Sequence, residues 1–517
     1  MNTLKRTLVY FYPFILALAP TLSLYQQNFF EVPFLNVCRS LILLGLLTLI
    51  VYALHLVIFR KNKAAARILS VVIVFFLLNF GAILSTIVAG KEGQIIQTWS
   101  ILLAAGMVLF VLFMVWMTSK RPGFTRNLDL FFGLMAAAFS LILAVGFGVK
   151  VFQINAPLSQ AQASVTTESQ DATFDSLPDI YFIVLDSYTS KEVLQKEFGF
   201  DNSEFLSQLI ELGFTIPTSA YSNYDATAYS LSSILNMDFV QSFTDPKVYE
   251  PGHYTIYDKS IHNQVREILQ QFGYKETTFS SDYPWLLWRD ADHVLEPQKK
   301  SFMTSGINQF EFLVLKKSVI NLLIIQKPYL IDDLSFWTGR LGEDKYQKQL
   351  FLIENLTKIP DDFAPKFIYA HSTIPHVPYL FRADGSMIAG VDQGSLNADF
   401  TQENLKQSYL QTISFVNARI IPQINAILEK NPNSIIILTG DHGYPGEDQN
   451  TIFFAIHDPG GHWPQNSCFS LINLFRRILS QHFGLVYPDL PDAVYRTLTQ
   501  DYYQFEQINA CSSNEND

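Results

Sequence analysis

Residues 179–186 read DIYFIVLD, and this short apolar run ending in an acid determines the fold expected for the second half of the chain. A continuous apolar run of this length is typical of a strand buried on both faces. Two similar runs follow at Lys366–Ala370 (KFIYA) and Ser434–Leu438 (SIIIL), with helical stretches between them. This alternation predicts an α/β domain, an α/β/α sandwich with a mainly parallel central sheet.

The remaining elements of this domain follow from hydrophobic spacing and from turn residues. Short strands are expected at Phe214–Pro217 and Thr451–Ile456. Helices are expected at Ser190–Phe198, Ser203–Leu212, Thr227–Met237, His262–Phe272, Gln402–Lys430 and Asn466–His482.

Residues that follow the predicted strands are the candidate site residues, because ligands of open α/β sheets bind at the carboxyl ends of strands. These residues are Asp186, His371, His376, Asp441 and His442. Each alone has an ordinary explanation, such as a helix cap, an Asx-turn or a loop histidine. Together, carboxylates and imidazoles suit a divalent cation such as Mn²⁺, Mg²⁺ or Zn²⁺. A hydroxyl at a helix start, as at Thr227, becomes a better nucleophile beside such a cation.

The chain before residue 152 has a different character. Five apolar runs of about the length that spans a bilayer occur there. The first contains two prolines but no small-residue cleavage site, so it is expected to be a retained span. Asn79 is the clearest polar residue inside a span, and we expect it to bond to a neighbouring helix. The runs are at about Leu8–Tyr25, Ser40–Phe59, Ile68–Ala89, Trp99–Met117 and Leu130–Val149.

Charge gives the orientation of these spans. Nine basic residues lie at the N-terminus and in two connections, against three on the opposite side. The excess predicts a cytoplasmic N-terminus. With five spans, the α/β domain is then expected outside the cell (inner) membrane.

The net charge of −11 combines two unlike halves. Residues 1–152 hold 12 basic and 3 acidic residues, whereas the remainder holds 24 and 44. Charged residues make up only 16%, which excludes a disordered chain and disfavours a wholly soluble one. Three scattered cysteines do not make a disulfide scaffold or a cysteine zinc site. The second half has no basic tract, so nucleic-acid binding is not expected.

The residues of these motifs and their order along the chain resemble those of the alkaline phosphatase/sulfatase superfamily. The similarity is to membrane-anchored members of the lipoteichoic acid synthase and phosphoethanolamine transferase kind. Residues 178–186 resemble the opening strand with its metal-binding acid, and 222–237 the nucleophile helix. Residues 375–379 (PHVPY) resemble the substrate-side histidine motif, and 439–443 (TGDHG) the metal motif.

This resemblance implies a set of roles. Thr227 would be the nucleophile, His376 would act in catalysis, and His376, Asn223 and His371 would contact substrate. One divalent ion would be held by Asp186, Thr227, Asp441 and His442, with a second site from His371, His457 and His462 less favoured. The implied enzyme is a metal-dependent phosphotransferase or phosphodiesterase acting on a membrane phospholipid headgroup or a cell-envelope glycan or polymer.

Two alternatives stay open. The first is a sulfatase-like hydrolase of sulfuric esters. Sulfatases convert a Cys or Ser to formylglycine, however, and the Thr227 found here cannot become that aldehyde. The second is an inactive membrane-anchored scaffold of the same fold.

The expected domain organisation has four parts. These are a transmembrane anchor at 1–152, a Ser/Thr/Gln-rich linker at 153–177, a catalytic domain at 178–500 and a C-terminal tail at 501–517.

Overall fold

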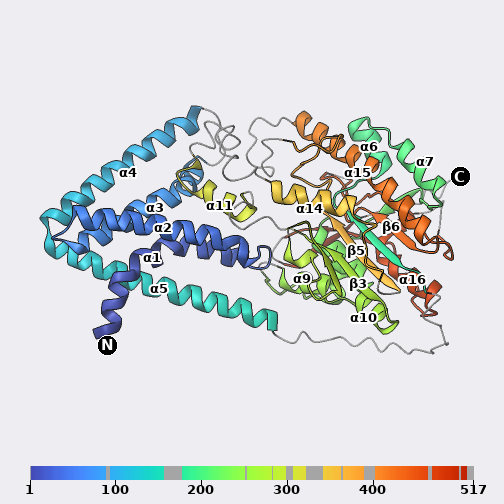
Figure 1. The fold of residues 1–517 in the computed structure, drawn as a ribbon, viewed down its shortest axis with the longest axis horizontal. Helices are drawn as coiled ribbons and strands as arrows, with labels where there is room; N and C mark the ends of the chain where they lie inside the picture. Colours follow the sequence, from blue (N-terminus) through green and yellow to red (C-terminus); the bar gives the residue numbers. More distant parts are fainter. Residues whose placement is uncertain are drawn as a thin grey trace. The chain divides into compact units, whose positions relative to one another are not determined.

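The computed structural model describes residues 2–88, 94–155, 177–250, 253–281, 283–298, 307–321, 342–361, 365–388, 402–446, 448–463, 468–499 and 502–508. The chain divides into two compact units (Figure 1). We call residues 1–160 with 301–341 the helical unit, and residues 161–300 with 342–517 the α/β unit. Most of the expected linker, residues 156–176, lies outside the described residues.

The helical unit contains five long helices in its N-terminal part. Four are long and apolar enough to cross a membrane: Phe34–Ile58, Lys63–Ile87, Thr98–Lys120 and Pro122–Phe152. The first helix is not one of these four, so five spans stay a prediction. The full bounds are α1 Asn2–Gln27, α2 Phe34–Ile58, α3 Lys63–Ile87, α4 Gln94–Lys120 and α5 Pro122–Asn155.

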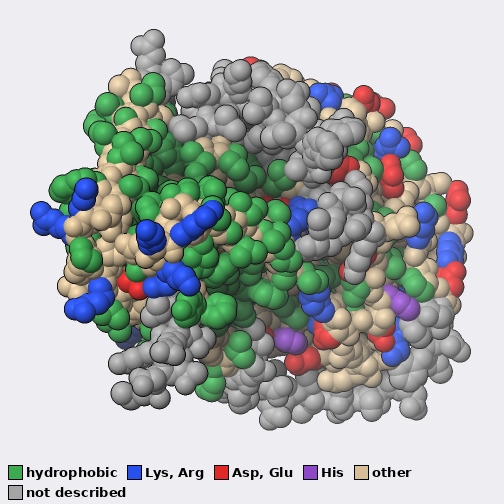
Figure 2. Space-filling model, turned by 60° about the vertical axis from the view of Figure 1, so that its left-hand side comes forward, with side chains coloured by type: hydrophobic (Ala, Val, Ile, Leu, Met, Phe, Trp, Pro, Cys, Tyr) green, Lys and Arg blue, Asp and Glu red, His purple; other side chains and the backbone are tan. Residues whose placement is uncertain are grey.

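Helix α3 is the most enclosed of the four candidate spans: 56% of its apolar window is buried, against 22% or less in the others. Figure 2 shows hydrophobic side chains covering the helices on the face in view, with Lys and Arg gathered at one end. Asn79 does not bond to a neighbouring helix as expected. Its amide donates to the Phe75 carbonyl of its own helix at 2.9 Å, since the side chain is exposed on the helix surface.

A buried polar cluster joins α1, α3 and α5. The Arg67 guanidinium donates two hydrogen bonds to the Asp129 carboxylate, at 3.0 and 2.7 Å. The Tyr12 hydroxyl donates to the same carboxylate at 2.8 Å. All three side chains are buried. The hydrophobic and charge patterns of the sequence did not predict this cluster.

Helix α11 (Gln309–Lys317) belongs to the helical unit although it lies between segments of the α/β unit in the sequence. Its Glu311 forms a two-point ion pair with Arg39 of α2. The Val319 amide donates to the Leu77 carbonyl of α3 at 2.7 Å. Gly81 permits this approach, because a Cβ there would lie 2.0 Å from the Lys316 carbonyl oxygen. Part of the expected catalytic domain is therefore built into the helical bundle.

The α/β unit has a six-stranded central sheet in the order β4-β3-β5-β1-β6-β7. Only β7 is antiparallel, which confirms a mainly parallel sheet. The strands are β1 Ile180–Leu185, β3 Lys275–Phe279, β4 His293–Leu295, β5 Lys366–Ser372, β6 Ile435–Thr439 and β7 Phe454–His457.

Helices cover both faces of this sheet (Figure 1). On one face, α7, α14 and α15 pack on Ile183 and Leu438, within the largest apolar core. On the other, Phe475 of α16 packs edge-on against Phe182 at 5.2 Å between ring centroids. The helices are α6 Lys191–Phe198, α7 Ser203–Glu211, α8 Thr227–Asn236, α9 Tyr254–Ile261, α10 Gln264–Gln271, α14 Glu343–Glu354, α15 Gln402–Lys430 and α16 Leu474–His482.

Several expected elements differ from the observed ones. Phe214–Pro217 makes one isolated bridge, and the strand β2 lies later, at Ser219–Tyr221. The start of the expected helix Asn466–His482 is instead the strand β8 (Cys468–Ser470), because it pairs with β2. A C-terminal hairpin of β9 (Val494–Thr497) and β10 (Phe505–Ile508) places part of the expected tail in a sheet.

Candidate functional site

Three adjacent strands bring the expected acids and histidines to one edge of the sheet. β1 lies between β5 and β6, and all three run parallel. Asp186 follows β1 directly, and its backbone N–H continues the pairing by donating to Ser372 at 3.0 Å. His371 lies inside β5, opposite Val184, and not after the strand as expected. Asp441 and His442 follow β6.

These side chains form two groups whose ligand atoms lie within 4.8 Å of one another. One group is Asp186, His376 and His442, and the other is Asp186, His371 and Asp441. Five of the seven expected site residues therefore converge at one point. Asp186, His371, Asp441 and His442 are all buried, while His376 is half-buried.

Polar atoms in this cluster lack hydrogen-bond partners, which is costly for buried groups. Asp186 Oδ1, Asp441 Oδ2 and both ring nitrogens of His371 are buried without a partner in the protein. Carboxylate oxygens and imidazole nitrogens are ligands that a divalent cation accepts. The residues present therefore fit a metal ion.

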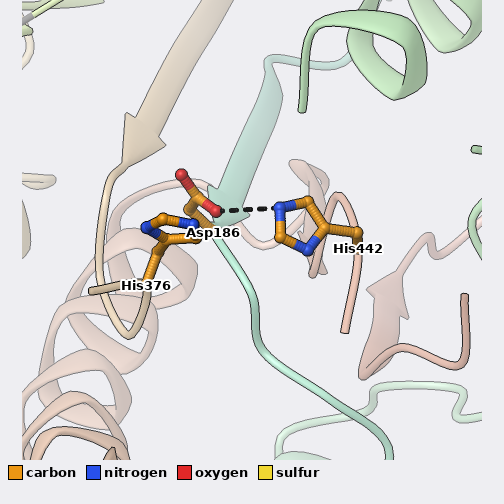
Figure 3. A group of neighbouring side chains, drawn as sticks. All are labelled: Asp186, His376 and His442. Atoms are coloured by element: carbon orange, nitrogen blue, oxygen red, sulfur yellow. Dashed lines mark ion pairs between the residues drawn. The ribbon is translucent and has the colours of Figure 1, made fainter. Parts of the chain in front are cut away.

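Two of the histidines are oriented for such a role. The His442 Nδ1 pairs with the Gly443 carbonyl at 2.8 Å, and the His376 Nδ1 with the Val377 carbonyl at 2.7 Å. A carbonyl only accepts, so each Nδ1 carries a proton, and in the neutral ring each Nε2 keeps its lone pair. Figure 3 shows the His442 Nε2 directed at Asp186, from which it lies 3.4 Å.

Ser187 holds the two acidic loops together. Its backbone N–H donates to Asp441 Oδ1 at 3.1 Å, and its hydroxyl donates to the Gly443 carbonyl at 3.1 Å. Its φ is +69°, which is uncommon for a residue other than glycine. Such strained backbone conformations are enriched at functional sites. Ser187 is not among the site residues predicted from the sequence. Its position directly after Asp186 was the available signal.

The glycines of the TGDHG motif allow the loop to pack closely. A Cβ at Gly440 would lie 2.4 Å from the Tyr188 carbonyl oxygen, and one at Gly443 would lie 2.4 Å from that of Thr451. Any side chain at either position would displace the loop that carries Asp441 and His442.

Thr227 is the first residue of α8, and its side chain is half-buried. The N-cap residue is Ala226, which has no side-chain cap. Thr227 is therefore not the cap, the ordinary explanation for a threonine at a helix start. The first turn of α8 is tied to the metal motif, because the Ser230 hydroxyl donates to the Asp441 carbonyl at 2.6 Å.

Asn223, expected at the substrate, is engaged within the protein. Its amide donates to Ser470 at 2.7 Å and to the Ala493 carbonyl at 2.8 Å, while its oxygen accepts from the Ile472 N–H at 2.8 Å. These bonds position the loop before α8. We therefore leave Asn223 out of the substrate contacts proposed below.

The expected partners of His371 in a second metal site are elsewhere. His457 lies on β7 opposite Ile436, at the start of β6, since β7 is antiparallel. Its Nδ1 contacts the Ser434 carbonyl at 2.9 Å. His462 is exposed. Among the described residues, neither joins the two groups at the strand ends.

The histidines of the site differ in electrostatics. Burial lowers the pKa of His371 to about 4, so this ring is neutral at physiological pH. Burial also acts to lower the pKa of His442, but the nearby charges of Asp441 and Asp186 outweigh it and raise that pKa. Without a cation, His442 therefore keeps its proton to higher pH.

Several solved structures are similar to this chain at low identity. The C-terminal periplasmic domain of EcEptC from Escherichia coli, in complex with Zn, is 12% identical, with 64% of this chain and 92% of that one covered and a TM-score of 0.38. The lipooligosaccharide phosphoethanolamine transferase A from Neisseria meningitidis is 13% identical, with 92% and 95% covered and a TM-score of 0.39. The lipoteichoic acid synthase LtaP from Listeria monocytogenes is 15% identical, with 64% and 81% covered and a TM-score of 0.36.

Among curated protein sequences, none matches this chain significantly. The model of the Sulfatase family matches residues 178–467, which is more than half of the 517 residues and includes every expected site residue. The chain belongs to the sulfatase family.

Proposed function

We propose that this protein is a membrane-anchored, metal-dependent phosphotransferase or phosphodiesterase that uses Thr227 as its nucleophile. The observation that carries the proposal is the group of buried, unpartnered ligand atoms on Asp186, His371 and Asp441, close to the start of α8. The substrate would be a phosphodiester of a membrane lipid headgroup or a cell-envelope polymer.

One divalent cation, Mn²⁺, Mg²⁺ or Zn²⁺, would be held by Asp186, Asp441 and His442, with Thr227 as a further ligand. His371 lies within ligand reach of the two carboxylates, so we add it to this set. When bound, such a cation acts as a Lewis acid that stabilises the alkoxide and the charge on phosphoryl oxygens.

The chain's own residues account for the remaining steps. The Thr227 oxygen would attack phosphorus and form a phospho-threonine, while the departing alcohol takes a proton. The uncapped first turn of α8 offers backbone N–H groups to the phosphoryl oxygens. His376, half-buried beside His442, would bind a phosphoryl oxygen or protonate the leaving group. An acceptor hydroxyl or water would then release the phosphoryl group.

The helical unit would hold this chemistry at the membrane. Four apolar helices of spanning length, with the basic connections on the cytoplasmic side, would place the α/β unit at the outer face. Because the segment that contains α11 belongs to the helical unit, the chain passes between the two units three times.

The test uses the full chain, purified in detergent micelles, because residues 301–341 group with the helices. Hydrolysis of a p-nitrophenyl phosphodiester, a phosphomonoester and a sulfate ester is measured with added Mn²⁺, Mg²⁺ or Zn²⁺. We expect metal-stimulated diester cleavage that falls about 10³-fold or more in Thr227→Ala, since removal of a nucleophile leaves only the residual catalysis of binding.

The matched control is Thr412→Ala, which removes a buried threonine hydroxyl of α15 that donates to the Ser408 carbonyl at 2.9 Å and lies 3.3 Å from the Phe381 carbonyl. Activity in Thr227→Ala equal to that of the Thr412→Ala control contradicts the nucleophile assignment. Preference for the sulfate ester would favour the sulfatase-like hydrolase. Absence of metal binding would favour the scaffold.

A further inference from the structure

Tyr409, near the start of α15, is buried where the loops that carry the candidate ligands meet. Its hydroxyl donates to the Ser187 carbonyl at 2.8 Å and accepts from the Thr189 N–H at 3.3 Å. Both partners belong to the segment directly after Asp186. The Tyr409 side chain is fully enclosed, with 0% exposure. One hydroxyl from a distant helix therefore bonds to both ends of residues 187–189.

The ring of Tyr409 contacts the other two loops of the site. Its centroid lies 5.7 Å from that of Tyr379, three residues after His376. It lies 4.9 Å from that of Tyr444, two residues after His442. Aromatic rings attract one another at such separations. Each of the three side chains in Figure 3 is thus carried by a segment that Tyr409 contacts.

A second attachment fixes α15 to the same segment. The Tyr188 hydroxyl donates to the Asn417 side-chain oxygen at 2.8 Å, and the Asn417 amide donates to Asn202 at 2.8 Å. The Asn202 amide closes the ring by donating to the Tyr188 hydroxyl at 3.1 Å. A movement of α15 away from residues 187–189 would break this ring of hydrogen bonds, so the support that carries Tyr409 is itself held in place.

The conformation of Ser187 needs support of this kind. Its φ of +69° is disfavoured for a residue with a Cβ and persists only where the surroundings determine it. From this conformation its N–H reaches Asp441 Oδ1 and its hydroxyl reaches the Gly443 carbonyl, each at 3.1 Å. Releasing the Ser187 carbonyl would therefore loosen the contact between the segment after Asp186 and the loop of Asp441.

We propose that Tyr409 is a positioning residue for the cation site. Its hydroxyl holds residues 187–189 in the conformation that sets Asp186 beside Asp441, and its ring packs the other two loops against them. The inference rests on the proposed function in taking a divalent cation as what this arrangement binds.

The test removes the hydroxyl and keeps the ring. Full-length Tyr409→Phe and wild type, both in detergent, are titrated with Mn²⁺, and the free ion is measured by electron paramagnetic resonance. We expect the dissociation constant to rise about tenfold in the variant. This is the lower end of the roughly 10–100-fold loss that follows removal of a group supporting metal ligands, because Tyr409 acts through Ser187.

The matched control is Tyr274→Phe. Tyr274 is 3% exposed, and its hydroxyl donates to the Pro178 carbonyl at 2.6 Å. Pro178 precedes β1, so this bond lies at the amino end of the strand, whereas the site lies at its carboxyl end. Both variants lose a buried hydroxyl that donates to a carbonyl, but Tyr274→Phe should keep the wild-type affinity for Mn²⁺. Equal affinity in the two variants overturns the proposal, because a tyrosine that only fills the core can be replaced by phenylalanine.

A second measurement needs no metal. Hydrogen exchange of the metal-free proteins, followed by mass spectrometry of peptide fragments, should be faster at residues 187–189 in Tyr409→Phe than in wild type or Tyr274→Phe. The reason is that the Thr189 N–H loses its acceptor. Unchanged exchange at these residues overturns the positioning role whether or not wild type binds Mn²⁺. Failure of wild type to bind Mn²⁺, with exchange raised as expected, counts against the proposed function and not against Tyr409 as the residue that positions this segment.

Discussion

The two units both bury charged side chains, and they differ in how those charges are satisfied. In the helical unit, the Asp129 carboxylate accepts three hydrogen bonds from Arg67 and Tyr12. In the α/β unit, Asp186 Oδ1 and Asp441 Oδ2 are buried with no hydrogen-bond partner. The ring of His442 is the nearest group that could carry a positive charge, 3.4 Å from Asp186 and 3.8 Å from Asp441. One imidazole does not balance two buried carboxylates, so the first arrangement is complete within the protein and the second fits an added cation.

The α/β unit also contains a complete pair, which shows that unpartnered acids are specific to the strand ends. The Arg266 guanidinium donates to Glu276 at 2.9 Å, and Gln270 donates to the same carboxylate at 3.2 Å. Both members of the pair are at most 4% exposed. Burial alone therefore does not mark a functional acid. The two acids at the strand ends differ from Glu276 in having a buried oxygen without a hydrogen-bond partner.

The largest effect is expected from neutralising a site acid. In Asp441→Asn, the amide oxygen still accepts from Ser187, but the charge that attracts a cation is lost. We expect activity toward the p-nitrophenyl phosphodiester to fall about 10³-fold, since a Lewis acid contributes several kcal/mol to the transition state. Thermal unfolding of the metal-free variant should occur at the same or a higher temperature than wild type.

The matched control is Glu276→Gln, which neutralises an acid with complete hydrogen bonding. It leaves the exposed carboxylate of Asp290, 3.1 Å away, as the remaining counter-charge of buried Arg266. The free energy of unfolding should therefore fall, by less than the roughly 3–5 kcal/mol expected for a fully unpaired buried charge. Metal affinity of the folded protein should stay at the wild-type value. If Asp441→Asn and Glu276→Gln lower the free energy of unfolding equally, then Asp441 and Glu276 do not differ in the way proposed here.

A somewhat smaller effect is expected in the helical unit. Asp129→Asn should lower the free energy of unfolding by about 3 kcal/mol, because the buried Arg67 cation loses its counter-charge. Thermal unfolding in detergent measures this. A triple variant, Tyr12→Phe with Arg67→Met and Asp129→Leu, replaces the whole cluster with apolar groups and should recover most of the loss. If the triple variant is no more stable than Asp129→Asn, the loss of stability is not explained by the unpaired charge of Arg67 alone.

The smallest effect concerns pH. Burial acts to lower the His442 pKa, but the charges of Asp441 and Asp186 raise it overall. Because the folded pKa is raised, this residue stabilises the metal-free fold fully below the unfolded value of about 6.5, and the contribution is lost as pH rises through the folded pKa. A bound cation needs the unprotonated ring, so metal affinity should increase about tenfold per pH unit below that pKa.

Calorimetric titration with Mn²⁺ in two buffers of different ionisation enthalpy tests this, since metal binding should release one proton. His371, with a pKa of about 4, should release none. Metal binding with no proton release would mean that His442 is not a ligand.

Much of the fold could be read from local sequence. The runs at 180–185, 366–370 and 435–438 are strands because only a buried strand suits such short apolar stretches. Elements that depend on distant partners were misjudged. Cys468–Ser470 forms a strand because it pairs with β2. Helix α11 packs in the helical unit because Gly81 has no side chain that would collide with it.

The candidate site divides in the same way. Sequence order placed Asp186, Asp441 and His442 after strands, and parallel pairing of β1 with β5 and β6 brought them together as expected. Asn223 looked equally polar and equally well placed, yet its bonds to Ser470, Ile472 and Ala493 occupy its side chain. No local pattern contains those partners.

The sequence by itself identified the buried strands β1, β5 and β6, four apolar helices of spanning length and the acids that follow strands, because apolar spacing and chain direction are local properties. Tertiary structure alone decided which buried polar atoms have partners. Asp129 and Asp186 are both buried acids, but Arg67 donates two hydrogen bonds to the first, whereas Asp186 Oδ1 accepts none and has only the His442 ring 3.4 Å away. Hydrogen bonds of this kind join residues far apart in the chain, so only the folded structure distinguishes a structural charge from a site for a cation.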